Sequence, residues 1–226
     1  LQFQPKYILI ESQDQFDHSI NFTQYEKHGD AWHNNFKSLK NHIRALYSLK
    51  KATRSVYNSH VNYQAVIFIR PDVLFMSPIP VPLLEKMVRS KERRNMIHLP
   101  DFHRLCRYYQ FNDRFAMMVP ELARFYGERF DGAEEYSKRN KLHSETFLYY
   151  HLHSYNISII EIPFRFQRVR SHGDIPNRDQ TIIPPQDNKK RVKRSFISRL
   201  FYPSDDPSNI FCSPNKRISF DKYEEQ

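Results

Sequence analysis

Glycine and cysteine are both scarce in this sequence, and each scarcity excludes a class of site. Only 4 of the 226 residues are glycine, so the sequence contains neither the GxGxxG turn of a dinucleotide-binding domain nor the GxxxxGK loop of a P-loop protein. The two cysteines, Cys106 and Cys212, cannot build the disulfide framework of a small secreted domain, and they lack the Cys/His spacing of a zinc site. This cysteine usage favours a reducing compartment.

Long apolar runs are also missing. No stretch of the sequence approaches the roughly 18 apolar residues of a membrane-spanning helix. The opening residues, LQFQPK, contain no signal-like apolar core. We therefore expect either a cytoplasmic protein or one that associates with the membrane of a secretory compartment through a signal not visible in this chain.

Large apolar side chains, by contrast, are abundant. The sequence contains 18 Phe and 14 Tyr, and 39% of its residues are hydrophobic, which is too much apolar surface for a disordered protein. Its length suits one α/β domain, or one domain with an appendage. We expect a folded domain over residues 1–175 and a basic C-terminal extension over residues 176–226, which either packs on the domain or is ordered only with a partner.

Positive charge is concentrated in that extension. The net charge of the chain is +10, and residues 189–199 contain six lysines and arginines. This segment is expected to be a solvated basic stretch, or else to bind an anionic surface or a nucleic acid or to serve as a processing signal. Basic residues also alternate with Tyr and Phe at 104–114, but because no RNP, KH or zinc-finger signature accompanies them, we expect no specific nucleic-acid partner.

Hydrophobic patterns predict alternating strands and helices. Strands are expected at residues 6–10, 65–69, 95–99, 114–119, 157–162 and 164–170. Helices are expected at residues 30–56, at 83–87, from residue 120 onward, and at 142–153. This order favours an α/β fold of three layers, α/β/α, around a mixed and mainly parallel sheet.

The segment 65–72 is the strongest functional signal. Residues 65–69, AVIFI, are apolar and largely β-branched, which predicts a strand covered on both faces at the centre of the sheet. Pro71 ends the strand, so that Asp72 is left where α/β proteins bind their ligands. Asp72 therefore either serves a ligand or closes a turn by pairing with Arg70.

The predicted helix at 30–56 offers further candidates at its beginning. Most of its apolar positions recur at helical spacing and are expected to pack on the sheet. Asn34 and Ser38 are the exceptions, because an amide or hydroxyl near a helix start is placed to reach a ligand at the sheet edge.

Several segments together resemble a known group, the GT-A-type glycosyltransferases, and in particular its small members from algae and large DNA viruses. These segments are residues 30–39 (DAWHNNFKSL), 45–49 (ALYSL), 68–75 (FIRPDVLF), 112–116 (NDRFA) and 143–148 (HSETFL). The resemblance spans roughly residues 5–172. It implies a GT-A-like fold and the transfer of a sugar from a nucleotide-diphosphate sugar to a hydroxyl of a glycan or glycoprotein acceptor.

The resemblance also implies Mn²⁺ or Mg²⁺, held by an Asp-x-Asp motif at the end of a central strand. This sequence departs from the motif, because Arg70-Pro71-Asp72 retains one carboxylate. Two arrangements remain open. Either Asp72 holds the cation together with His172, which we favour over Asp174, or Arg70 balances the diphosphate charge in place of a metal.

The resemblance assigns roles to further residues. Arg168 and Arg170 join Arg70 and Asp72 in stabilising the leaving diphosphate. Asp113 contacts sugar or acceptor hydroxyls, unless it merely pairs with Arg114. Glu145 is the general base of an inverting reaction or a binding residue of a retaining one, unless it only belongs to a capping box with Ser144.

Two functions from other classes compete with transfer. The first is a noncatalytic module that binds carbohydrate or a polyanion and has lost the second carboxylate. The second is RNA binding through basic and aromatic residues, which would depend steeply on salt.

Overall fold

The computed structural model describes residues 5, 7–90, 94–103 and 109–182. The predictions for the basic segment 189–199 and for the two cysteines lie outside these residues. No helix in the described part is long and apolar enough to cross a membrane.

Helices and strands alternate along the described chain. The helices are α1 (Gln13–Ser19), α2 (Thr23–Glu26), α3 (Lys37–Asn58), α4 (Val81–Arg89), α5 (Pro120–Gly127), α6 (Phe130–Ser137), α7 (Ser144–Ser154) and α8 (Asn177–Gln180). The strands are β1 (Val66–Ile69), β2 (Val73–Phe75), β3 (Met96–Pro100), β4 (Phe115–Met118), β5 (Ser158–Ile162) and β6 (Phe166–Arg168). The protein is thus a mixed α/β protein, as predicted.

Four strands form the main sheet in the order β1-β4-β3-β5. β4 is antiparallel to both β1 and β3, whereas β3 and β5 are parallel. The prediction of a mixed sheet is confirmed, but the expectation of mainly parallel pairing is wrong, because β4 runs against its neighbours on both sides. The other three strands share one direction and therefore end at the same edge of the sheet.

β1 lies at the side of the sheet and not at its centre, which corrects the sequence prediction. Its burial decreases along the strand, from Val66, which is buried, to Ile69, which is 42% exposed. An apolar run indicates that both faces of a strand are covered. It does not indicate whether the strand has a neighbour on one side or on both sides.

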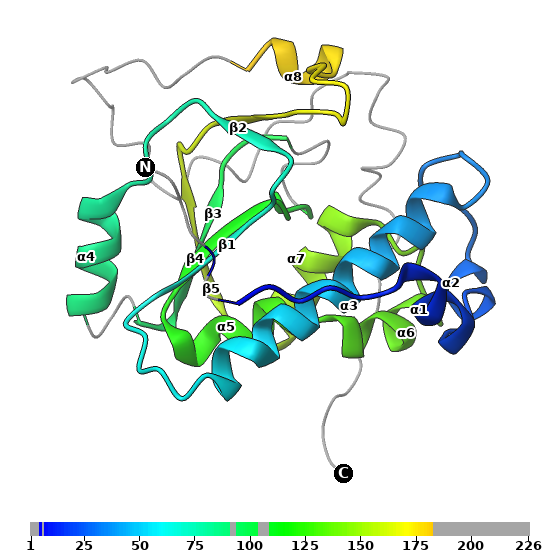
Figure 1. Ribbon diagram of the computed structural model, residues 1–226, viewed down its shortest axis with the longest axis horizontal. Coiled ribbons are helices and arrows are strands. Elements are labelled where there is room, and N and C mark those ends of the chain that lie inside the picture. Colours follow the sequence, from blue (N-terminus) through cyan, green and yellow to red (C-terminus); the bar gives the residue numbers. More distant parts are fainter. Residues whose placement is uncertain (1–4, 6, 91–93, 104–108, 183–226) are drawn as a thin grey trace, which may run out of the picture.

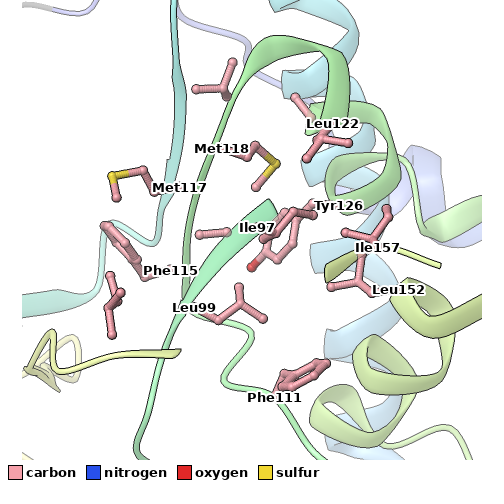
Figure 2. Packing of buried hydrophobic residues seen from close by; sticks show 14 of the residues in the cluster. Ile97, Leu99, Phe111, Phe115, Met117, Met118, Leu122, Tyr126, Leu152 and Ile157 are labelled. Carbon is pink, nitrogen blue, oxygen red and sulfur yellow. The ribbon is translucent and has the colours of Figure 1, made fainter. Parts of the chain in front are cut away.

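Helices cover the sheet on both sides. In Figure 1, α3, α5 and α7 lie to one side of the strands and α4 lies to the other, giving three layers. Figure 2 shows the main core, where residues of β3 and β4 face those of α5 and α7. Its members include Ile97, Leu99, Met118, Tyr126 and Leu152, each at most 1% exposed.

A second core joins the helices beyond the sheet. Its buried residues come from α2, α3, α6 and α7 and include Tyr25, Leu39, Ile43 and Phe147. Where α3 meets α5, the backbones approach so closely that a Cβ on Gly127 would lie 1.9 Å from Oγ1 of Thr53. The glycine is therefore needed for this helix contact.

Two predicted elements differ from the structure. Residues 7–10 form no strand, and their side chains are exposed, from 56% for Leu9 to 89% for Ile10. The predicted helix at 30–56 begins only at Lys37, because the carboxylate of Asp30 accepts the backbone N–H groups of residues 32, 34 and 36 and folds them into a turn.

Candidate active site at the strand ends

The carboxyl ends of β1, β3 and β5 and the start of β4 share one edge of the sheet. Ile69 is paired with Phe115 in the antiparallel register of β1 and β4. The segment that follows β1, residues 70–72, therefore lies beside the segment that precedes β4, residues 112–114. This topology brings Asp72 and Asp113 to the same edge although 41 positions of sequence separate them.

Arg70 holds Asp72 with two hydrogen bonds. Nε of Arg70 donates to Oδ1 of Asp72 at 2.8 Å, and Nη2 donates to Oδ2 at 2.6 Å. These bonds lower the pKa of Asp72, so the carboxyl group is ionised at neutral pH. The alternative role predicted for Asp72, pairing with Arg70, is therefore present. The Asp72 side chain is nevertheless 35% exposed and open to a ligand.

Asp113 is ionised, and one of its two carboxylate oxygens has no hydrogen-bond partner. Its Oδ1 is buried and accepts no hydrogen bond, while its backbone carbonyl accepts one from the hydroxyl of Tyr126 at 2.9 Å. Burial alone would raise the pKa of Asp113, but the neighbouring positive charges, that of Arg114 first, outweigh it and lower that pKa. Because Oδ1 is fully buried and the residue is only half-buried, a hydroxyl group can reach this anion only at Oδ2.

Arg114 pairs with Glu145 instead of Asp113. Its Nη2 donates to Oε1 of Glu145 at 3.1 Å, and the hydroxyl of Ser144 donates to Oε2. Nδ1 of His143 lies 3.5 Å from the same Oε2. The N-cap of α7 is His143, which makes no capping bond through its side chain, so the predicted capping box at Ser144 and Glu145 is wrong.

Arg168 lies at this edge but is held by Asp179. β6 pairs with β2 so that Arg168 stands opposite Val73, the residue after Asp72. The fully buried Asp179 accepts from Nε of Arg168 at 2.8 Å and from Nη2 at 2.5 Å. Burial would raise the pKa of Asp179, but these bonds lower it to about 2. Helix α8 is thereby fastened to β6.

The two candidates at the start of α3 serve the helix itself. Oδ1 of Asn34 accepts the backbone N–H of Ser38 at 3.1 Å, and its Nδ2 donates to the Ser38 hydroxyl at 2.7 Å. Asn34 is exposed and Ser38 is half-buried. Their position nevertheless borders the site, because Trp32 in the preceding turn stacks on His143 with ring centroids 5.2 Å apart.

Arg170 and His172 lie in an exposed turn after β6. The backbone N–H of Arg170 donates to the carbonyl of Asp174, and that of Gly173 donates to the carbonyl of Arg170, each at 2.8 Å. No hydrogen bond or ion pair joins either side chain to Asp72 within the described residues. Two ligands of one cation need not touch each other, so the metal role of His172 with Asp72 stays a prediction.

The residues around Asp72 fit a divalent cation poorly. Among the described residues, no group of three His, Cys, Asp or Glu side chains is arranged to hold a metal ion. Both oxygens of Asp72 already accept from Arg70, whereas Mn²⁺ and Mg²⁺ prefer several oxygen ligands. Arg70 and the neighbouring Arg168 suit phosphate oxygens, because guanidinium groups donate in pairs to such anions.

Sequence reasoning did not single out His42 and His143 at this edge. His42 is 8% exposed, and its ring lies 6.0 Å from that of Trp32. Burial lowers the pKa of His42 to about 3, so the ring is uncharged at neutral pH. Only one signal pointed to His143, namely its place directly before Ser144 and Glu145 in the segment 143–148.

A surface hollow elsewhere contains none of these candidates. It is lined by Pro82, Glu85, Lys86, Arg89 and Ser90 of α4 and its C-cap.

Comparison of the chain with family models, with curated proteins and with solved structures finds no match.

Proposed function

We propose that the protein is a glycosyltransferase of GT-A-like fold that transfers a sugar from a nucleotide-diphosphate sugar to a hydroxyl of a glycan or glycoprotein. One observation supports this most strongly. Five residues selected from the sequence for this chemistry gather at one edge of the sheet: Arg70, Asp72, Asp113, Glu145 and Arg168. The order and register of the strands bring these residues together, and neither was used when the residues were chosen from the sequence.

The arrangement suits the departure of a diphosphate. Cleavage of the bond between sugar and phosphate leaves negative charge on the diphosphate, and arginines placed beforehand stabilise that charge. Arg70 is 45% exposed in its side chain and is held in position by Asp72. Arg168 is adjacent and reaches a diphosphate by sharing its donors between Asp179 and the phosphate oxygens.

The sugar has its own contact in this scheme. Asp113 is ionised and half-buried, so its accessible oxygen accepts a hydrogen bond from a sugar hydroxyl close to the arginines. The role of Mn²⁺ or Mg²⁺ at Asp72 and His172 stays a prediction, and charge compensation by Arg70 is the better supported arrangement. Arg170 is retained as a secondary diphosphate contact, since its exposed side chain follows Arg168 by two positions.

A noncatalytic carbohydrate-binding module is the second candidate. It is favoured by the pairing of each edge arginine with a carboxylate: Arg70 with Asp72, Arg114 with Glu145, and Arg168 with Asp179. A diphosphate must compete with these carboxylates, whereas a neutral glycan need not.

A donor panel separates the two candidates. The protein is incubated with UDP-glucose, UDP-galactose, UDP-N-acetylglucosamine, GDP-mannose and GDP-fucose, each with Mn²⁺ and with EDTA, and release of the nucleoside diphosphate is measured. We expect release with one donor, with little dependence on Mn²⁺. Asp72→Ala should reduce it by about 100-fold or more because Arg70 loses its orientation.

The control for this substitution is Asp14→Ala, in the exposed first turn of α1. It removes a carboxylate of the same type without disturbing Arg70 and should leave release unchanged. A thermal shift caused by glycans, with no release from any donor, would favour the binding module instead.

A further inference from the structure

Glu145 is poorly placed to act alone on a substrate. It is 8% exposed, and its carboxylate has partners in Arg114, Ser144 and His143. A general base must reach the proton that it removes, directly or through one water molecule. A buried carboxylate that is already occupied by donors instead resembles a group that orients another side chain.

His143 has the complementary properties. Its side chain is 19% exposed, against 10% for that of Glu145. Its Nδ1 faces Oε2 of Glu145 at 3.5 Å and Oγ1 of Thr146 at 3.3 Å. Within the described residues its Nε2 makes no hydrogen bond. Oε2 of Glu145 accepts, and Oγ1 of Thr146, which accepts from Nε2 of Gln110, can accept a further bond, so both partners suit the tautomer with the proton on Nδ1 and a lone pair on Nε2.

The ring is also fixed in orientation. Trp32 stacks on it with an angle of 27° between the ring planes. The other charged or titratable neighbours of this pair include Arg114, which donates to Glu145, Arg168, whose charge interacts with that of Glu145, and His42, whose ring lies near Trp32. A base locked by packing and by a hydrogen-bonding partner is the arrangement that catalysis requires.

We infer that His143 is the general base of the proposed transfer and that Glu145 is its positioning residue. In this step Nε2 removes the proton of the acceptor hydroxyl while the acceptor oxygen bonds to the anomeric carbon. The bond from that carbon to the diphosphate breaks, and its electron pair leaves with the diphosphate. The positive charge on the imidazolium is balanced by Glu145. The inference rests on the proposed function and requires inversion at the anomeric carbon.

The kinetic test uses His143→Gln, which retains a polar side chain of similar reach. Removal of a general base lowers kcat by roughly 100- to 10,000-fold, and we expect this loss with the donor KM unchanged. Free imidazole should restore part of the activity of His143→Ala. His153→Gln is the matched control, because it makes the same change in the last turn of α7 and should leave kcat unchanged.

A second measurement does not need turnover. In protein labelled with ¹⁵N-histidine, long-range ¹H–¹⁵N spectra report which ring nitrogen carries the proton, and His143→Gln identifies the resonance. We expect His143 protonated on Nδ1 in the wild type at neutral pH. Glu145→Gln should shift the population toward the Nε2-protonated tautomer, whereas Glu135→Gln, on the surface of α6, should not.

The outcomes separate the two proposals. If the wild type releases diphosphate and His143→Gln is equally active, only the inference is overturned. The inference is also overturned if His143 is protonated on Nε2 and its tautomer does not change in Glu145→Gln. Retention of anomeric configuration in the product also overturns it, since no base is then needed at this position. Absence of release with every donor overturns the proposed function, and the catalytic role of His143 with it.

Discussion

Asp179 is the buried carboxylate that holds Arg168 at the strand ends, and Asp179→Asn removes its charge while keeping its shape. The carboxylate is fully buried and accepts from the backbone N–H, Nε and Nη2 of Arg168. Nε2 of His103 lies 3.5 Å from Oδ1. Loss of the charge therefore weakens the bonds from Arg168 that fasten α8 to β6, whereas the bond from Nε2 of Gln167 to the backbone carbonyl of Asp179 remains.

The size of the effect follows from the pKa. The pKa of Asp179 falls from the ordinary 3.8 to about 2 on folding, and each unit corresponds to about 1.4 kcal/mol. The ionised group thus contributes about 2 to 3 kcal/mol to the free energy of unfolding at pH 7. Because the folded-state pKa is the lower one, this contribution is complete well above pH 4 and disappears as the pH falls toward 2.

Urea unfolding, followed by the fluorescence of the single tryptophan and by circular dichroism, measures this difference. Asp179→Asn should lower the free energy of unfolding by about 2 to 3 kcal/mol at pH 7, and the gap to wild type should narrow as the pH is lowered through 4. Asp174→Asn, five positions earlier and exposed, is the control. Equal stability of Asp179→Asn and wild type at pH 7, or a gap independent of pH, would refute the reasoning.

Two further predictions concern the core. Gly127→Ala places a Cβ 1.9 Å from Oγ1 of Thr53 and should cost about 1 to 3 kcal/mol in urea unfolding. The double variant with Thr53→Ala should recover only part of this loss, because the Cβ of residue 53 remains 2.8 Å away; strict additivity would contradict the contact. Burial lowers the pKa of His151 to about 4, so the unfolded state takes up a proton first and stability should decline by about 2 to 3 kcal/mol as the pH falls from 6.5 to 4. His151→Gln, which can still donate to the carbonyl of Phe125, should flatten that decline, and an unchanged slope would argue against a neutral buried ring.

The local elements of the fold were largely predictable because their signals are local. The strands around 66–69, 96–100 and 158–162 stand where apolar runs predict them, and Pro120 opens α5 as expected of proline in a first helical turn. The sheet order was not predictable in this way. Pairing of β4 with both β1 and β3 joins segments distant in sequence, and apolar composition is the same for parallel and antiparallel neighbours.

Errors in the helices have particular causes. The start of α3 was placed seven residues early because residues 30–36 contain helix-compatible apolar spacing, while Asp30 instead caps a turn in which His33, Asn35 and Phe36 have positive φ. Helix α6, residues 130–137, was missed because it is short and contains a glycine.

For the site, the sequence identified acidic and basic residues at strand ends but not their partners. That Asp72 pairs with Arg70 was foreseen, since the two residues are neighbours in sequence. The pairing of Arg114 with Glu145 and of Arg168 with Asp179 depends on the packing of α7 and α8, which no local pattern encodes. Asn34 and Ser38 illustrate the converse, since residue type suggested ligand contacts and the structure shows both side chains bonded to each other at the start of α3.

The proposed function requires that the edge formed by Arg70, Asp72 and Asp113 bind a nucleotide-diphosphate sugar. This binding can be observed in a crystal of the protein soaked with a uridine or guanosine diphosphate sugar. We expect diphosphate oxygens within hydrogen-bond distance of the Arg70 guanidinium and a sugar hydroxyl that donates to Asp113. A nucleotide bound elsewhere on the protein, with the Arg70 and Asp72 pair unchanged, would contradict the proposed function.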